Sequence, residues 1–231
     1  MSHYRDKTLF IDIGNSAIKW SIDGQNYTSI IDDFSVEMLP KADNVWVSCV
    51  ANCEILDGLS NINIATTDFK FGPLECGYKN PNELGIDRYL AMIAATDLYK
   101  NQNLLVVDIG SAVTFDVVLS TGLHKGGLIM PGLKAIRNSF AKFSTNNSDI
   151  QTKKLTQNSA DAWLSGTSFM LLNSIERQIY SYKDKYKNIT VIVTGGGAEK
   201  VLEYLNFNTN YHNNLVLDGL CIYAETLNNA H

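Results

Sequence analysis

A short phrase occurs twice in the chain. It begins at Leu9 and reads Leu-Phe-Ile-Asp-Ile-Gly-Asn-Ser, and it returns at Leu105 as Leu-Val-Val-Asp-Ile-Gly-Ser-Ala. In both copies an apolar run ends in an acid, a glycine follows two residues later, and a second β-forming run then begins. Each copy is therefore predicted to form a strand, a tight polar turn and a strand. The repetition indicates a duplicated unit, with a cleft between the two copies.

The two turns have the chemistry of a phosphate-binding site. Gly14 and Gly110 have no Cβ, so the backbone can approach a ligand closely. The N–H groups of such turns, and the hydroxyl groups of Ser16 and Ser111, can donate hydrogen bonds to phosphoryl oxygens. We therefore expect the two turns to hold one nucleotide from two sides.

An acid precedes each of these glycines. Asp12 and Asp108 cannot donate hydrogen bonds, and a carboxylate beside a polyphosphate is repelled unless a cation lies between them. The two acids are therefore interpreted as groups that hold a metal ion or water. An aspartate and a glycine at a strand end are also common in ordinary turns, and either copy alone is open to that interpretation.

The chain is predicted to form two domains of mixed α/β structure. The polar stretch 100–103 separates one domain over residues 1–102 from a second over residues 103–231. Alternating β-rich runs and helical patterns favour the α/β class. Strands are expected near residues 8–13, 17–22, 26–31, 44–50, 62–66, 105–109, 115–119 and 189–193. Helices are expected over residues 87–95, 133–143 and 160–183, with two more after residue 197.

Composition limits the partners that the chain can have. The 231 residues carry a net charge of −5 with mostly scattered lysines, which argues against a nucleic-acid-binding surface. The first apolar run is short and is interrupted by Asp12, so neither a signal peptide nor a membrane span is expected. These features predict a cytoplasmic protein that binds neither nucleic acid nor membrane. The four cysteines lack the paired spacing of a metal site and are expected to be reduced, mostly buried thiols.

The sequence from Gly85 to Arg88 places an acid and a guanidinium group at the start of a predicted helix. One interpretation is a helix cap, in which the Asp87 carboxylate accepts hydrogen bonds from backbone N–H groups. The other is functional: a carboxylate at the mouth of a nucleotide cleft can orient an attacking hydroxyl group and accept its proton. Arg88 would then hold an anionic substrate or steady the transferring phosphoryl group.

Three consecutive glycines, 195–197, follow the strand expected over residues 189–193. They give a loop without side chains at a helix start, which could support adenine, ribose or phosphate. A plain strand-to-helix turn is the alternative interpretation.

Five motifs follow one another along nearly the whole chain. They are Asp12–Ser16, the segment from Pro81 through Gly85–Arg88, Asp108–Ala112, Gly126–Gly132 and Thr194–Gly197. As an ordered set they resemble the type III pantothenate kinase family. The resemblance implies the fold of the acetate and sugar kinase, Hsp70 and actin superfamily, in which two ribonuclease-H-like domains flank a nucleotide cleft.

The resemblance also implies roles for individual residues. The ATP-binding residues would be Asp12, Ile13, Gly14, Asn15, Ser16, Ala17, Ile18, Lys19, Ser111, Gly195, Gly196 and Gly197. The pantothenate-binding residues would be Tyr78, Gly85, Ile86, Asp87, Arg88 and Ser159, with Asp87 as the catalytic proton acceptor. Asp108 would be a ligand of a monovalent cation, K⁺ or NH₄⁺, and Asp12 is assigned to the Mg²⁺ that accompanies ATP.

The function implied by the resemblance is ATP-dependent phosphorylation of pantothenate to 4′-phosphopantothenate, the first step of coenzyme A biosynthesis. It also implies a homodimer in which one subunit helps to close the pantothenate site of the other. Two alternatives stay open. One is a kinase of the same fold that acts on another small metabolite, and the other is a non-catalytic, actin-like regulatory protein that kept the nucleotide cleft.

Overall fold

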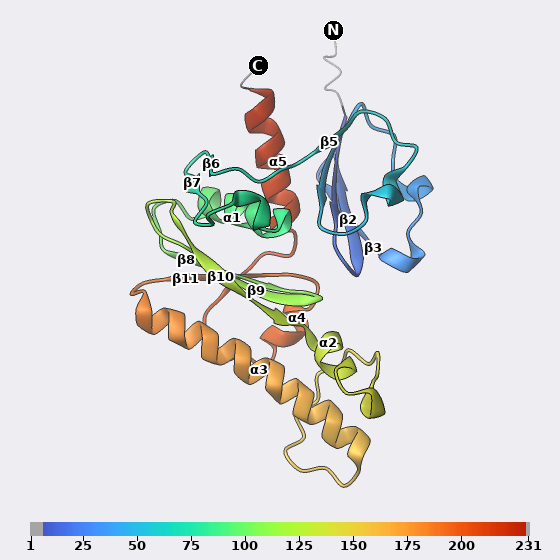
Figure 1. Ribbon diagram of the computed structural model, residues 1–231, viewed down its shortest axis with the longest axis vertical. Coiled ribbons are helices and arrows are strands. Elements are labelled where there is room, and N and C mark those ends of the chain that lie inside the picture. Colours follow the sequence, from blue (N-terminus) through green and yellow to red (C-terminus); the bar gives the residue numbers. More distant parts are fainter. Residues whose placement is uncertain (1–6, 230–231) are drawn as a thin grey trace. The chain divides into compact units, whose positions relative to one another are not determined.

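The computed structural model of the chain describes residues 7–229 (Figure 1). Its contacts divide the described chain into two compact units: unit 1 comprises residues 7–98 and 214–229, and unit 2 comprises residues 99–213. The C-terminal segment therefore belongs with the first half, which corrects the expected second domain over residues 103–231. The physical reason is that its helix packs on the helix and sheet of unit 1.

Unit 1 is built on a five-stranded sheet with the strand order β3-β2-β1-β4-β5. β1 (Thr8–Ile13), β2 (Ala17–Ile22) and β3 (Gln25–Ile30) form an antiparallel meander. β4 (Asn44–Cys49) pairs parallel to β1, and β5 (Ile62–Ile64) pairs parallel to β4. Alternate residues of β1 and β2 are buried, because one face of these strands lies in the core.

Short helical turns and a small hairpin connect the strands of unit 1. The 3₁₀ turns η1 (Ile31–Asp33), η2 (Val36–Met38) and η3 (Cys53–Leu56) follow β3 and β4. Apolar residues in and beside these turns pack against the buried face of β1, β2 and β4. The hairpin of β6 (Lys70–Phe71) and β7 (Leu74–Glu75) and the turn η4 (Pro81–Glu83) then lead into the first α-helix.

Two helices, α1 (Ile86–Leu98) and α5 (Leu215–Asn228), pack on each other in unit 1. α5 also covers the second face of the sheet, where Trp46 of β4 contacts Tyr223 with ring centroids 6.0 Å apart. Gly219 permits the close approach of the two helices, because a Cβ at this position would lie 2.0 Å from the carbonyl oxygen of Leu90. This contact explains why α5 belongs to unit 1.

Cys49 and Cys53 are joined by a disulfide, and the prediction of reduced thiols is wrong for these two residues. β4 ends at Cys49 and the chain turns at once into η3, so the two Cα atoms come within 6.2 Å of each other. Cys76 and Cys221 are free, as predicted for them.

Unit 2 repeats the sheet of unit 1 with the strand order β10-β9-β8-β11-β12. β8 (Leu104–Ile109), β9 (Ala112–Val118) and β10 (His124–Pro131) form the antiparallel meander. β11 (Thr190–Thr194) pairs parallel to β8, and β12 (Asn210–Tyr211) pairs parallel to β11. Order and strand directions match those of unit 1, which confirms the duplication predicted from the repeated phrase.

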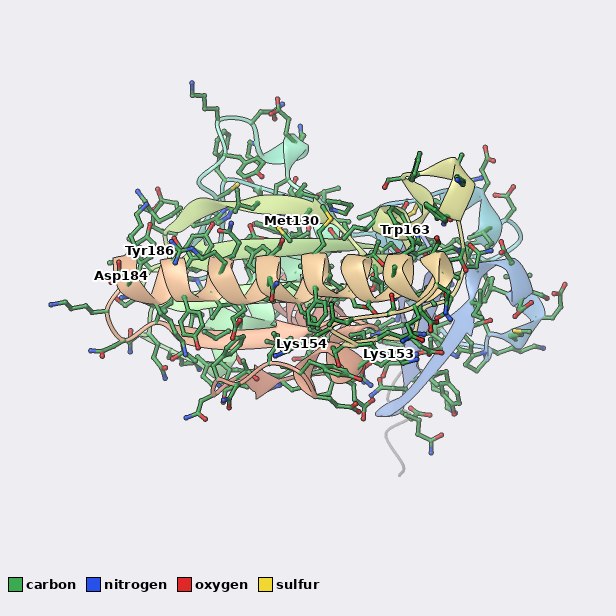
Figure 2. The ribbon with its side chains drawn as sticks, turned by 90° about the horizontal axis from the view of Figure 1, so that it is seen from below. Met130, Lys153, Lys154, Trp163, Asp184 and Tyr186 are labelled. Carbon is green, nitrogen blue, oxygen red and sulfur yellow. A yellow bond between two sulfur atoms is a disulfide. The ribbon has the colours of Figure 1, made fainter. Side chains whose placement is uncertain are left out.

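The long helix α3 (Ser159–Lys185) runs along one face of this sheet (Figures 1 and 2). Leu171, Ile175 and Ile179 are buried against β8, β9 and β11, as their spacing on one helix face predicts. Figure 2 labels Trp163 near the first turns of α3 and Asp184 near its last turn. The shorter helices are α2 (Leu133–Asn138) and α4 (Ala198–Leu202).

The single helix expected over residues 133–143 is divided into α2 and the 3₁₀ turn η5 (Ala141–Phe143). Ser139 follows α2, and its hydroxyl group donates to the carbonyl oxygen of Ile136 at 2.7 Å. The next residue, Phe140, has extended backbone angles. A side-chain hydroxyl that takes a helical carbonyl in this way competes with continuation of the helix, so the element ends early.

Candidate active site

The first repeated turn follows β1 and is closed by its own backbone. The N–H group of Gly14 donates to the carbonyl oxygen of Ala17 at 3.0 Å, and the N–H group of Ile31 donates to the carbonyl oxygen of Ser16 at 3.1 Å. Asn15 and Ser16 are exposed at the tip of the turn. The turn therefore presents the side chains of two polar residues and its backbone to a ligand, as the sequence predicts for a phosphate loop.

Asp12 lies near the end of β1, where its carboxylate is buried beside the Ser48 hydroxyl group. Ser48 of the neighbouring β4 donates its hydroxyl group to Asp12 Oδ1 at 2.9 Å, and Lys19 of β2 lies directly opposite in the register. Burial raises the pKa of Asp12 to about 6, the Ser48 hydrogen bond lowers it, and repulsion from Asp87 raises it further. A carboxylate that burial destabilises in this way is one that a bound cation would stabilise.

Asp87 lies in the first turn of α1 rather than at its cap. The helix begins at Ile86, and the carbonyl oxygen of Gly85 accepts from the N–H group of Tyr89 at 3.1 Å. Asp87 Oδ1 accepts from the N–H group of its neighbour Arg88 at 2.8 Å. The carboxylate thus makes a local backbone hydrogen bond, but it is not the N-cap that the structural interpretation of this motif predicts.

Gly85 leaves the space that Asp87 needs. A Cβ on Gly85 would lie 2.6 Å from Asp87 Oδ1, closer than side-chain and carboxylate atoms normally approach. α1 packs against β4, the strand next to β1, and the charge of Asp87 helps to raise the pKa of Asp12, so the start of α1 and the end of β1 lie in the same part of unit 1. Two of the predicted site elements, the first turn and the Gly85–Arg88 segment, are therefore brought together.

Arg88 and Tyr78 form a pair beside Asp87. The Arg88 side chain donates from Nη1 to the Tyr78 hydroxyl oxygen at 3.1 Å, and its guanidinium carbon lies 5.7 Å from the centre of the Tyr78 ring. Arg88 is only 6% exposed, so its cation is held rigidly at the start of the helix. The structure thus groups Tyr78 with Gly85, Asp87 and Arg88, four of the residues expected to bind the acceptor.

The glycine loop, residues 195–197, packs on the second repeated turn in unit 2. The N–H group of Gly110 donates to the carbonyl oxygen of Ala112 at 2.9 Å, and the N–H group of Gly197 donates to the carbonyl oxygen of Ile109 at 2.8 Å. Gly195 has a φ of +101°, and a Cβ there would lie 2.3 Å from Asp108 Oδ1. Only glycine fits this conformation and this contact. The glycine loop is a strand-to-helix turn, between β11 and α4, that also packs on the second repeated turn.

Asp108 and the carbonyl oxygen of Ile109 both face Gly195. An added Gly195 Cβ would lie 2.3 Å from Asp108 Oδ1, 2.5 Å from the Ile109 oxygen and 2.6 Å from the Ile109 nitrogen, so the glycine loop packs tightly on the end of β8. Carboxylate and carbonyl oxygens are suitable donors for a hard cation such as K⁺ or Mg²⁺. Asp108 therefore stays a predicted cation ligand; residues 7–229 contain no cluster of three or more histidine, cysteine, aspartate or glutamate residues suited to a metal ion.

Ser159 is the first residue of α3 and is exposed. The preceding Asn158 caps the helix by accepting from the N–H group of Asp161 at 2.8 Å. The segment before it is anchored by Arg137, a fully buried cation that donates to the carbonyl oxygen of Asp149 at 2.8 Å. Ser159 belongs to unit 2, whereas Tyr78 and Arg88 belong to unit 1, so its place in the acceptor site stays a prediction.

Sequence reasoning assigned no role to two residues that support the repeated turns. Ser48 lies within an apolar strand, and only the parallel pairing of β1 and β4 sets it beside Asp12. Gly132 packs on the second turn, because a Cβ there would lie 2.4 Å from the carbonyl oxygen of Gly110. The Pro-Gly pair at residues 131–132 is a signal for Gly132, but no local pattern marks Ser48.

Comparisons with known proteins identify relatives of this chain. The type III pantothenate kinase family matches residues 43–181 of the chain. A type III pantothenate kinase from Nitrosospira multiformis is 31% identical over 237 residues, and the match covers 94% of this chain and 90% of the relative.

None of the helices within residues 7–229 has both the length and the apolar character needed to cross a membrane.

Solved structures extend the likeness to the fold. A Campylobacter jejuni protein described as a conserved Baf family transcriptional activator has a TM-score of 0.63 at 24% identity, covering 96% of this chain and 99% of that one. A non-polymerisable quadruple mutant of pCBH ParM has a TM-score of 0.53 at 10% identity, covering 96% and 100%. These likenesses confirm the predicted α/β fold. Because the family match spans more than half of the chain and the relative nearly all of it, the chain belongs to the type III pantothenate kinase family.

Proposed function

We propose that the protein phosphorylates the primary hydroxyl group of pantothenate with ATP, giving 4′-phosphopantothenate, the first step of coenzyme A biosynthesis. The observation that carries the proposal is the group formed by Tyr78, Asp87 and Arg88 beside Asp12, in a chain of this family. It combines a base, a rigid cation and a phosphate turn within unit 1. A kinase needs these three features to orient an acceptor against ATP.

Asp87 is the proposed proton acceptor. Its carboxylate lies in the first turn of α1 with one oxygen engaged by the Arg88 N–H group. It orients the pantothenate hydroxyl group and accepts its proton as the new P–O bond forms and the bond to the β-phosphate oxygen breaks. Arg88, fixed by Tyr78, supplies positive charge to the pantothenate carboxylate or to the transferring phosphoryl group. Gly85 and Ile86 complete the acceptor side, and Ser159 is proposed to line it.

The two turns are proposed to bind ATP. Residues 12–19 supply the first phosphate loop, Ser111 the hydroxyl group of the second, and the glycines 195–197 a surface for the rest of the nucleotide. Three observations support this: the closed turn at Gly14, the closed turn at Gly110 and the packing of Gly197 on Ile109. Most of the rate enhancement would then come from positioning and charge neutralisation.

Cations complete the proposed site. Asp12 would help to hold the Mg²⁺ that accompanies ATP, and Asp108 would hold a monovalent cation, K⁺ or NH₄⁺. When bound, these ions neutralise the negative charge that grows on the phosphate oxygens. The raised pKa of Asp12 and the place of the Asp108 carboxylate near the end of β8, beside the second turn, support these assignments. The active form is proposed to be a cytoplasmic homodimer, with no nucleic-acid or membrane partner.

The test is an acceptor panel. The purified protein is incubated with ATP, Mg²⁺ and K⁺, and separately with pantothenate and with other small hydroxy acids and sugars, followed by mass detection of phosphorylated products. We expect a product from pantothenate. A product from another acceptor alone would indicate a different metabolite kinase. ATP binding without any phosphorylated acceptor would indicate a regulatory protein instead.

A further inference from the structure

The end of β4 supports the first phosphate turn from the side. Cys49 lies opposite Ile13 in the parallel ladder of β1 and β4. The ladder continues one residue further, because the N–H group of Val50 donates to the carbonyl oxygen of Ile13 at 3.2 Å. Ser48, the residue before Cys49, donates its hydroxyl group to Asp12. The three residues 48–50 therefore hold the two residues, Asp12 and Ile13, from which the turn departs.

The disulfide joins this support to the turn that follows it. Cys49 is the last residue of β4, and Cys53 is the first residue of η3. η3 is fixed at both ends: the Asn52 side chain accepts from the N–H group of Glu54 at 2.9 Å, and Leu56 is buried in the core. The disulfide thus ties the edge of the phosphate turn to a second anchored element, across only three intervening residues.

Both sulfur-bearing residues are within reach of solvent. Cys49 and Cys53 are each half-buried, whereas Cys76 is buried. A half-buried pair in a short surface loop can meet a small reagent without unfolding of the core. In a reducing compartment, which the proposed cytoplasmic location implies, protein disulfides are usually transient and serve catalysis or redox sensing. An exchangeable disulfide beside the proposed nucleotide site suits redox sensing.

We propose that Cys49 and Cys53 form a reversible redox pair that sets the affinity of the first turn for ATP; the effect on catalysis rests on the proposed function. Low-molecular-weight disulfides such as glutathione disulfide are the oxidant class. One cysteine thiolate attacks the small disulfide and releases one small thiol, and the second cysteine then displaces the other. The two cysteines lose two electrons and two protons, and the small disulfide becomes two thiols. Excess small thiol reverses the reaction.

The disulfide affects ATP binding because it limits the conformations that residues 50–52 can adopt. The oxidised loop has few conformations, so residues 48–50 stay against β1. In the reduced protein the loop gains freedom, and ordering it becomes part of the cost of binding ATP. The oxidised form should therefore bind ATP more tightly, by about fivefold or more, the lower range of coupling between two sites. The turnover number should change little, because Asp87 lies on a different element.

The test uses the full-length chain equilibrated in glutathione buffers from reducing to oxidising. Alkylation followed by peptide mass mapping reports the Cys49–Cys53 bond, titration with MgATP reports affinity, and steady-state assays separate KM for ATP from kcat. We expect formation of the bond and tighter ATP binding to follow one curve. Cys49→Ser and Cys53→Ser should both lose the redox response and resemble the reduced protein. Cys221→Ser, which removes a free cysteine on α5, should keep the response.

Three results are decisive, and the first two need no variant. Oxidising buffers that leave Cys49 and Cys53 separately alkylated would overturn the proposal. So would equal ATP affinities for the bonded and the reduced wild-type protein. A response that Cys49→Ser retains would also overturn it. Failure of the proposed function has a different signature: no phosphorylated pantothenate in either redox state, with bond formation and ATP affinity still measurable.

Discussion

Asp12 is a residue whose burial lowers the stability of the folded chain at neutral pH. Its pKa rises from an ordinary value of 3.8 to about 6, chiefly through burial, so the folded state prefers the protonated form between these values. As pH rises from about 4 to about 6, the free energy of unfolding of the protein therefore decreases. Above pH 6 the loss is complete and amounts to at most about 3 kcal/mol.

Replacement of Asp12 by Asn should therefore stabilise the protein without metal or nucleotide. We expect Asp12→Asn to increase the free energy of unfolding in EDTA at pH 8, by up to about 3 kcal/mol, and to have little effect below pH 4. Asn keeps an oxygen that can accept from Ser48. Urea denaturation at several pH values measures the effect, with Asp57→Asn, an exposed site, as the control. A gain that is the same at every pH would contradict the account.

Asp87 should be needed for turnover rather than for folding. We expect Asp87→Asn to lower kcat by about 10²- to 10⁴-fold, as for loss of one general base, while ATP still binds. The Asn side chain can still accept from the Arg88 N–H group, so the start of α1 should persist. Steady-state kinetics and MgATP titration measure the two effects. Glu83→Gln removes a nearby exposed carboxylate and should leave kcat unchanged. Full activity in Asp87→Asn would return this residue to a purely structural role.

Single residues were predictable from sequence where a local motif marks them. The strand-end acid and glycine at Asp12 and Gly14 and the helix-start pair at Asp87 and Arg88 are such motifs, and the structure brings both into unit 1. Ser48 was not predictable, because its contact with Asp12 depends on which strand pairs with β1. A serine in an apolar run carries no information about its partner.

Among the elements, the close packing of α1 on α5 depends on the absence of a Cβ atom at Gly219. A Cβ at position 219 would lie 2.0 Å from the Leu90 carbonyl oxygen, so Gly219→Ala must push the helices apart. We expect a loss of about 3 kcal/mol in the free energy of unfolding of unit 1. Gly166→Ala is the matched control: Gly166 is exposed in α3 with nothing within 4 Å of an added Cβ.

The control should change stability in the opposite direction. Alanine is favoured over glycine in a helix by about 1 kcal/mol, so Gly166→Ala should stabilise the protein slightly. Urea denaturation of both variants measures the difference. If Gly219→Ala were as stable as the wild type, the close packing of α1 on α5 would not hold in solution.

Helices with a strong hydrophobic periodicity were predicted well. Helix ends that depend on a competing side-chain hydrogen bond were not. The apolar stripe of α3 predicted a helix close to its observed bounds, Ser159–Lys185. The end of α2 at Asn138 was missed, because the Ser139 side chain and the Phe140 backbone decide it. The Cys49–Cys53 disulfide was also missed: the spacing resembled no metal site, and only the turn after β4 brings the two residues together.

In the whole molecule, the last helix, α5, packs into the unit formed by the first part of the chain. Unit 2 is continuous from residue 99 to residue 213, whereas unit 1 needs residues 214–229 in addition to 7–98. The duplication was readable from the repeated phrase, but the return of α5 was not. Nothing in the sequence of an apolar helix states which of two similar sheets it covers.

This division predicts how fragments fold. We expect residues 99–213 alone to unfold cooperatively in urea, since they contain their own core. Residues 1–98 alone should show no cooperative transition, because they expose the sheet face and the α1 face that α5 covers. Addition of a peptide of residues 214–231 should restore the transition. Circular dichroism measures all three, and cooperative unfolding of residues 1–98 alone would show that α5 is dispensable.

We propose that one turn from each unit holds the same ATP, with the acceptor facing Asp87. A crystal structure with a non-hydrolysable ATP analogue, Mg²⁺ and pantothenate is the decisive test. We expect the triphosphate to contact both the turn after Asp12 and the turn after Asp108, and the primary hydroxyl group of pantothenate to lie within hydrogen-bond distance of Asp87. A nucleotide bound to only one of the turns, or a pantothenate remote from Asp87, would contradict it.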